Sequence, residues 1–267
     1  MYSVAEAMEN SGIDVEKINV DRAGVIWGSG IGGLATLEKE IEEHITGDGT
    51  PRYNPFMIPK MISEIAAGLI SIRYGFRGAN FATVSACASS SHAIGTAFDQ
   101  IRLGRQDVVI TGGSEATVTK AGVGGFNAMK ALSTRNDDYK TASRPFDADR
   151  DGFVLGEGAG AIVLEELEHA KKRGATIYAE IVGAGATADA HHITAPHPEG
   201  LGAGNVMRIA LADAGLNPDT TFLFQKGENW ASEIEMAQNH WSFDYDAIKS
   251  ETDSNAVILK IRGFSRV

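Results

Sequence analysis

Hydrophobic residues in this chain follow two patterns, a helical spacing and short uninterrupted runs. Leu34, Leu37, Ile41 and Ile45 share one face of a predicted helix at 34–45. The run RAGVIWGSG at 22–30 instead predicts a buried strand that ends in glycines. The same criteria predict helices at 4–10, 56–73 and 87–103, strands at 81–86, 107–113 and 177–185, and a strand followed by a helix within 159–174.

Glycines mark the ends of two of these predicted helices, with Gly12 after the first and Gly174 after the last. Helices separate most of the predicted strands along the chain. Because a helix between two strands is the usual connection of a parallel pair, the order predicts βαβ units in a layered α/β fold.

Composition and charge limit the classes of function. The chain has 267 residues, enough for a substantial core, and a formal net charge of -11. This acidity argues against general nucleic-acid binding. The N-terminus lacks a basic stretch followed by an apolar one, and no apolar run is long enough to span a membrane. The single cysteine, Cys87, excludes an intrachain disulfide and a multi-cysteine zinc site, and suits a reducing cytoplasm.

The composition changes near Pro218. Of 31 glycines, only Gly227 and Gly263 lie beyond it, and residues 219–267 show no clear alternation of strands and helices. This segment has three interpretations: a small appendage, a partly disordered tail, or the product of a frame change or fusion.

Cys87 lies where a predicted strand passes into a predicted helix, in FATVSACASSSHAIGTAF (81–98). A lone cysteine is often a small buried hydrophobic residue. Here its neighbours, among them Ser85, Ala86 and Ser89, are small enough for a substrate to approach. A helix N-terminus stabilises a thiolate, and a first-turn N–H can help to hold an oxyanion. The stretch therefore favours a nucleophilic cysteine on a strand-to-helix turn.

The motif SACASSSHAIG (85–95) resembles the active-cysteine motif of the β-ketoacyl-acyl-carrier-protein synthases. Further blocks match that family in the same order over about residues 4–218, and together they resemble its elongating synthase II type. These blocks are GSGIGGL (28–34), TGGSEA (111–116), GVGGFNAMKALSTRND (122–137), ASRPFDADRDGFVLGEGAGAIVLEELEHAKKRGA (142–175) and DAHHITAPHPEG (189–200).

The resemblance implies a thiolase-like fold, of which this chain would hold the N-terminal half, layered as an α-β-α sandwich. It implies decarboxylative condensation of malonyl-acyl carrier protein with a cysteine-bound acyl chain in fatty-acid synthesis. The substrates would be carried on the phosphopantetheine arm of acyl carrier protein, so no separate cofactor or metal is expected. It also implies a cytoplasmic homodimer that binds neither nucleic acid nor membrane.

By the same resemblance, Cys87 is the acyl-accepting nucleophile. Ile31 and Phe126 match residues that line the acyl-chain pocket, Thr194 matches a contact of the phosphopantetheine arm, and Lys130 matches a position near the carrier-protein docking surface. Each has a simpler alternative. Core packing explains Ile31 and Phe126 about as well, Thr194 can satisfy its own loop, and Lys130 can belong to a solvated face.

Two other motifs have weaker functional interpretations. Asp147, Asp149 and Asp151 alternate as in a calcium loop, but the acidic residue that an EF-hand needs at its far end is missing. We therefore expect a charged structural loop there. GSGIGG follows a strand and opens a helix, but it lacks the G-x-G-x-x-G spacing of a dinucleotide site.

The family pattern includes parts that this sequence lacks. The resemblance implies a strand before the position of Met1, and two catalytic histidines next to glycines in the second half, whereas none of the seven histidines here adjoins a glycine. We therefore expect a ketoacyl synthase N-terminal domain at 1–218 without its first strand, a tail at 219–267 without family resemblance, and impaired condensation. The alternatives are a non-catalytic module that binds acyl chains or acyl carrier protein, and an inactive truncated product.

Overall fold

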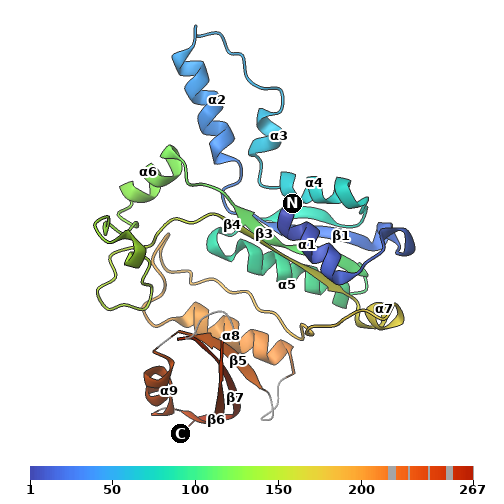
Figure 1. Ribbon diagram of the computed structural model, residues 1–267, viewed down its shortest axis with the longest axis vertical. Coiled ribbons are helices and arrows are strands. Elements are labelled where there is room, and N and C mark those ends of the chain that lie inside the picture. The colour runs from blue at the N-terminus through green and yellow to red at the C-terminus, as the bar shows by residue number, and fades with distance from the viewer. Residues whose placement is uncertain (216–220, 228, 240, 251–254, 267) are drawn as a thin grey trace. The chain divides into compact units, whose positions relative to one another are not determined.

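A computed structural model describes residues 1–215, 221–227, 229–239, 241–250 and 255–266 (Figure 1). The chain divides into two compact units, Met1–Glu180 and Ile181–Val267. The boundary predicted near Pro218 lies outside the described residues, so the division into 1–218 and 219–267 stays a prediction.

The first unit is built on a four-stranded sheet with the order β2-β1-β3-β4. Strands β1 (Ala23–Gly28), β2 (Asn80–Thr83) and β3 (Val108–Glu115) run parallel, as the sequence predicted. Strand β4 (Gly158–Glu165) is antiparallel to β3, with Glu115 opposite Gly158. The chain leaves β3 and enters β4 at the same edge of the sheet, so this connection is not a parallel crossover.

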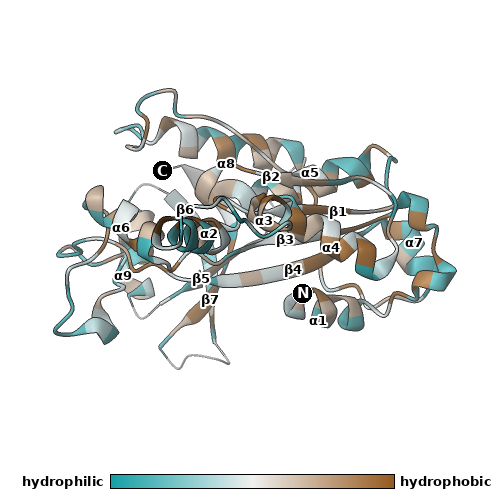
Figure 2. Cartoon of the chain, turned by 90° about the horizontal axis from the view of Figure 1, so that it is seen from above, coloured by the Kyte–Doolittle hydropathy of each residue, from teal (hydrophilic) through white to brown (hydrophobic). Residues whose placement is uncertain are grey.

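Alternating residues of the strands bury two faces of this sheet. Val25 and Trp27 of β1 pack in one cluster with residues of α1 (Tyr2–Ser11) and α4 (Ile65–Tyr74). Ile26, between them in sequence, packs in another cluster with residues of α5 (Ser89–Arg102). Successive strand side chains point to opposite faces, so the sheet is covered on both sides. This confirms the layered α/β fold, and Figure 2 shows hydrophobic residues of the central strands and α4 in brown.

The remaining helices of this unit are α2 (Leu34–Thr46), α3 (Met57–Met61), α6 (Lys120–Ala128) and α7 (Leu167–Lys172). The single helix predicted at 56–73 was wrong, because α3 and α4 are separated by Ile62–Glu64, where Ile62 is extended. The break exposes the carbonyl of Met61, which accepts a hydrogen bond from the Gly33 N–H at 2.8 Å. The bond between Gly33 and Met61 therefore accompanies a break in a segment whose residues favour a continuous helix.

The second unit contains α8 (Leu201–Asp213), β5 (Phe222–Lys226), α9 (Trp230–Gln238), β6 (Trp241–Lys249) and β7 (Val257–Arg266). The strands form an antiparallel sheet with the order β5-β7-β6. Ile234 of α9 packs with Phe243, Leu259 and Ile261 in a small core. The described residues beyond Pro218 therefore include a small sheet packed on one helix, and the three interpretations of residues 219–267 stay predictions.

The strand predicted at 177–185 was wrong, because Ile177–Gly185 is irregular in structure. Its glycines lie against α8. A Cβ on Gly183 would stand 2.5 Å from the carbonyl oxygen of Ala210, and one on Gly185 would stand 2.6 Å from that of Val206. The Ala184 N–H donates to Asp213 at 3.0 Å. A strand needs a neighbouring strand for its backbone groups, and residues 183–185 instead pack on α8.

Candidate active site

Cys87 lies in a short 3-10 turn, Ala86–Ala88, between the end of β2 and the start of α5. Its side chain is exposed, which excludes the buried hydrophobic role considered from the sequence. The residue before it, Ala86, has φ 50°, in the left-handed region that L residues rarely adopt. Such strained backbone persists only where the surroundings hold it, and it is typical of functional sites. The turn thus presents the thiol at the N-terminal end of a 14-residue helix.

Hydroxyl groups hold this strained turn. The Ser85 N–H donates to the Oγ of Ser89 at 2.9 Å, and that Oγ donates to the carbonyl of Ala86 at 2.7 Å. The Oγ1 of Thr83 donates to the carbonyl of Ser89 at 2.7 Å. The Oγ of Ser85 lies 2.6 Å from Nδ1 of His92. The small serines of the motif therefore fix the backbone on both sides of Cys87, a role that composition alone did not reveal.

Glycines in the central strands let α5 approach the sheet closely. A Cβ on Gly28 would lie 2.5 Å from the backbone nitrogen of Ser90, and a Cβ on Gly113 would lie 1.9 Å from the Oγ of Ser90. Real Cβ atoms do not make contacts this short. Glycine at both positions is therefore a requirement of the close helix–strand packing that places Cys87 at the edge of the sheet.

The loop after β1 carries Ile31 beside this turn. A Cβ on Gly30 would lie 3.4 Å from the carbonyl oxygen of Ala86, so the loop adjoins the residue before Cys87. The side chain of Ile31 is 43% exposed, which argues against simple core packing. The carboxylate of Glu115, the last residue of β3, accepts backbone N–H bonds from Gly30 at 2.7 Å and Ile31 at 2.8 Å. Sequence reasoning missed Glu115, and its only signal was a place in the TGGSEA block.

Phe126 lies on α6, beyond the end of β3. It is half-buried, and its ring meets that of Phe153 edge-on with centroids 5.3 Å apart. The carboxyl ends of neighbouring parallel strands meet at one edge of a sheet, so Ile31, Cys87 and Phe126 all follow strand ends at the same edge. The structure therefore supports grouping these three residues, while their roles toward an acyl chain stay predictions.

Two carboxylates of α2 hold the start of α6. Glu38 accepts the Ala121 N–H at 2.8 Å, and the ammonium group of Lys120 lies 2.9 Å from Glu42. The backbone bond from Ala121 is the main cause that lowers the pKa of Glu38 below its ordinary value. These contacts tie the helix that bears Phe126 to the helix that follows the Ile31 loop.

The other two predicted site residues are exposed. Lys130 follows α6 with φ 56°, and its side chain faces solvent. Thr194 belongs to the second unit, where its N–H donates to Nδ1 of His192 at 3.2 Å. That contact fits the alternative of a residue that satisfies its own loop. A carrier-docking role for Lys130 and a phosphopantetheine contact for Thr194 stay predictions.

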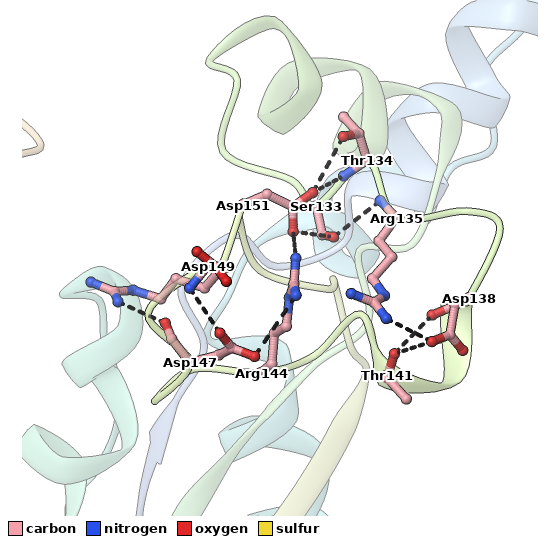
Figure 3. A network of polar contacts seen from close by, with 10 residues as sticks. Ser133, Thr134, Arg135, Asp138, Thr141, Arg144, Asp147, Asp149 and Asp151 are labelled. Carbon is pink, nitrogen blue, oxygen red and sulfur yellow. Dashed lines mark hydrogen bonds and ion pairs between the residues drawn. The ribbon is translucent and has the colours of Figure 1, made fainter.

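The alternating aspartates form part of a polar network with Ser133, Thr134 and Arg144 (Figure 3). Asp151 accepts bonds from the Oγ of Ser133 at 2.7 Å and the N–H of Thr134 at 2.8 Å. The bond from Ser133 is the main cause that lowers the pKa of Asp151 to about 2. Arg144 lies 3.5 Å from Asp151 and 3.8 Å from Asp147, between the two carboxylates. The network joins the two ends of the loop between residues 133 and 151.

Among the described residues, no group of three or more histidine, cysteine, aspartate or glutamate side chains is placed to hold a metal ion. In the same part of the chain, no helix is both long enough and apolar enough to cross a membrane.

The sheet covered by helices on both faces and the exposed cysteine on the turn after β2 define a protein of the thiolase-like class. The β-ketoacyl synthase N-terminal domain matches residues 1–170, and the C-terminal domain of that family matches residues 178–224. The chain belongs to the β-ketoacyl synthase family. The C-terminal match extends past residue 218, so six residues of the predicted tail fall within the family pattern.

Curated relatives agree with this assignment. The chain is 48% identical over 219 residues to 3-oxoacyl-[acyl-carrier-protein] synthase 2 of Coxiella burnetii (strain RSA 493 / Nine Mile phase I), covering 82% of this chain and 53% of the relative. It is 49% identical over 228 residues to the Staphylococcus aureus protein of the same name, covering 85% and 56%. The chain thus spans about half the length of the curated relatives it matches.

Solved structures show the same fold. One is the complex AntDE:AntF, a type II PKS acyl-carrier protein with its ketosynthase bound to the hexaketide. It matches with a TM-score of 0.74 and 32% identity, covering 80% of this chain and 54% of that chain. A β-ketoacyl synthase from Burkholderia phymatum STM815 matches with a TM-score of 0.73 and 26% identity, covering 100% and 81%.

Proposed function

We propose that this chain carries the acyl-accepting centre of a 3-oxoacyl-[acyl-carrier-protein] synthase of type II fatty-acid synthesis. The observation that carries the proposal is the exposed Cys87 on a strained turn at the N-terminal end of α5. A thiol held there is accessible to a substrate, because its side chain is exposed. The chain belongs to the β-ketoacyl synthase family and resembles 3-oxoacyl synthases, which supports an acyl thioester as the electrophile that Cys87 attacks.

In the proposed acyl transfer, the Cys87 thiolate attacks the carbonyl carbon of an acyl thioester on acyl carrier protein. A new C–S bond forms, and the tetrahedral intermediate collapses with release of the phosphopantetheine thiolate, which takes up a proton. Covalent catalysis of this kind divides one difficult step into two easier ones. Malonyl-acyl carrier protein would then lose carbon dioxide, and its carbanion would attack the carbonyl carbon of the cysteine-bound acyl group. The C–S bond to Cys87 would break, which frees the cysteine sulfur and leaves the 3-oxoacyl product on acyl carrier protein.

Acyl carrier protein is the partner that this chemistry requires. The AntDE:AntF structure, in which a ketosynthase is complexed with an acyl-carrier protein, supports the partnership. Lys130 is the proposed docking cation, and Thr194 the proposed contact of the phosphopantetheine arm. We further propose a homodimer, which accompanies the family resemblance, and a place in the cytoplasm, which suits a chain with one cysteine.

Intact mass spectrometry tests the acyl transfer directly. The full chain is incubated with octanoyl-acyl carrier protein beside the Cys87→Ser variant. The expected result is a mass gain of one octanoyl group on the wild-type chain, which the variant does not acquire as a stable adduct. No gain on a folded wild-type chain would refute the proposal.

A second candidate is a module that holds acyl chains without condensing them. It is favoured by the absence from this sequence of any histidine next to a glycine, the context in which the family resemblance places the catalytic histidines. Adding malonyl-acyl carrier protein to the octanoylated chain separates the two candidates. Release of a 3-oxodecanoyl product supports the synthase, whereas a persistent octanoyl adduct supports the holding module.

A further inference from the structure

The loop after β1 is held by one carboxylate from another strand. Oε2 of Glu115 accepts the N–H groups of Gly30 at 2.7 Å and Ile31 at 2.8 Å, and Oε1 accepts that of Gly32 at 3.1 Å. The Oγ of Ser29 lies 3.4 Å from Oε1. Three consecutive backbone donors that converge on one anion form a backbone nest, and charge-assisted bonds of this kind are about twice as strong as neutral ones.

The opposite side of the loop is fixed by the break between α3 and α4. The Gly33 N–H donates to the carbonyl of Met61, and a Cβ on Gly32 would lie 2.7 Å from the same oxygen. A Cβ on Gly33 would lie 2.1 Å from the carbonyl oxygen of Lys60. The loop is therefore confined between a glutamate and a helix break, with little room to adopt another conformation while both are present.

The confined loop also lies next to the turn that carries Cys87. Gly30 adjoins the carbonyl of Ala86, whose left-handed conformation sets the direction of the cysteine that follows. The next residue of the loop, Ile31, leaves a large apolar side chain 43% exposed. Glu115 thus binds the backbone of a residue with an exposed hydrophobic side chain, in a loop that adjoins the turn of an exposed thiol.

We propose that Glu115 is a positioning residue that fixes the Ile31 loop against the Cys87 turn and so determines which acyl chains the thiol accepts. The inference rests on the proposed function and extends it, since it assigns selectivity to a residue that need not touch the substrate. The apolar tail of a long acyl chain would contact Ile31, while an acetyl group would not reach beyond the thiol. Loss of Glu115 should therefore impair long-chain transfer more than short-chain transfer.

The Glu115→Ala variant removes the acceptor of three N–H groups and leaves the nucleophile in place. We expect the ratio of octanoyl to acetyl transfer rates, each from acyl carrier protein, to fall by roughly tenfold. A misplacement of about 1 Å at the reacting group can cost a hundredfold in rate, and a displaced Ile31 loop should cost less because it contacts the chain and not the reacting atoms. Amide hydrogen exchange in the peptide 28–36 should accelerate in the same variant, since the loop loses its protecting bonds.

Glu166→Ala is the matched control. Glu166 also accepts a backbone N–H through its carboxylate, from His169 at 2.7 Å at the start of α7. This variant loses a helix cap and some stability, so it separates general destabilisation from the loss of the nest. It should retain the wild-type octanoyl-to-acetyl ratio and the wild-type exchange rate at 28–36.

Formate provides a rescue experiment, because a small carboxylate can enter the vacated nest of Glu115→Ala. Added formate should restore part of the octanoyl-to-acetyl ratio in this variant and leave Glu166→Ala unchanged. An unchanged ratio together with unchanged exchange at 28–36 in Glu115→Ala would overturn the inference. If the wild-type chain accepts neither acyl group, the proposed function fails, and the exchange measurement still decides whether Glu115 holds the loop.

Discussion

Replacing Gly28 by alanine tests whether close packing of α5 on β1 places Cys87. A Cβ at this position would stand 2.5 Å from the nitrogen of Ser90, 2.6 Å from the carbonyl carbon of Ser89 and 2.6 Å from the Cα of Ser90. All three are backbone atoms at the start of a helix, so no side-chain rotation relieves the overlap. Carbon atoms in favourable contact lie about 3.5–4.0 Å apart, so the start of α5 must move by about 1 Å.

Two effects follow from that displacement. Overpacking of a well-packed interior costs about 1–3 kcal/mol, so the free energy of unfolding of the first unit should fall by that amount. The same movement misplaces Cys87, which lies three residues before Ser90. A shift of about 1 Å at a reacting group costs roughly a hundredfold in rate, so octanoyl transfer to Cys87 should slow by about that factor.

The assay has two measurements. Urea unfolding is monitored by hydrogen exchange in peptides of β1 and α5, and the rate of octanoylation of Cys87 is measured separately. Gly160→Ala in β4 is the control, because a Cβ on Gly160 would meet no atom within 4 Å. The free energy of unfolding of Gly160→Ala should stay within about 1 kcal/mol of wild type. Alanine there meets no neighbour and only reduces the conformational freedom of the unfolded chain relative to glycine. If Gly28→Ala and Gly160→Ala behave alike in both measurements, the packing argument is refuted.

Two further predictions concern Asp151 and Ala86. Bonds from Ser133 and Thr134 lower the pKa of Asp151 from 3.8 to about 2, so its stabilising contribution is complete above about pH 4 and is lost as the pH falls through about 2. Asp151→Asn should therefore be less stable than wild type at pH 6, with the difference shrinking toward pH 2 in urea titrations; a constant difference would contradict the assignment. Ala86→Gly should raise the free energy of unfolding by about 1 kcal/mol, because glycine adopts φ 50° without the cost that L residues bear. A loss of stability of that size would show that the turn is not strained.

The site was only partly predictable from the sequence. The position of Cys87 on a strand-to-helix turn follows from local patterns, because a short strand signal passes into a helical spacing there and small residues surround the thiol. Glu115 gave no such signal, since its partners lie 83 to 85 residues earlier in the chain. Nothing in a local pattern shows which carboxylate a distant loop will bind.

The hydrophobic pattern by itself determined the layered α/β class, the parallel strands β1 to β3 and the helices α1, α2, α5 and α7. These features depend on uninterrupted apolar runs and on a spacing of about 3.6 residues, which each segment carries on its own. Only the tertiary structure decided that β4 is antiparallel, that 56–73 breaks into two helices and that 177–185 is irregular, with residues 183–185 against α8. In each of these cases, the backbone partner comes from a distant part of the chain, and the choice among partners depends on packing that a local pattern does not contain.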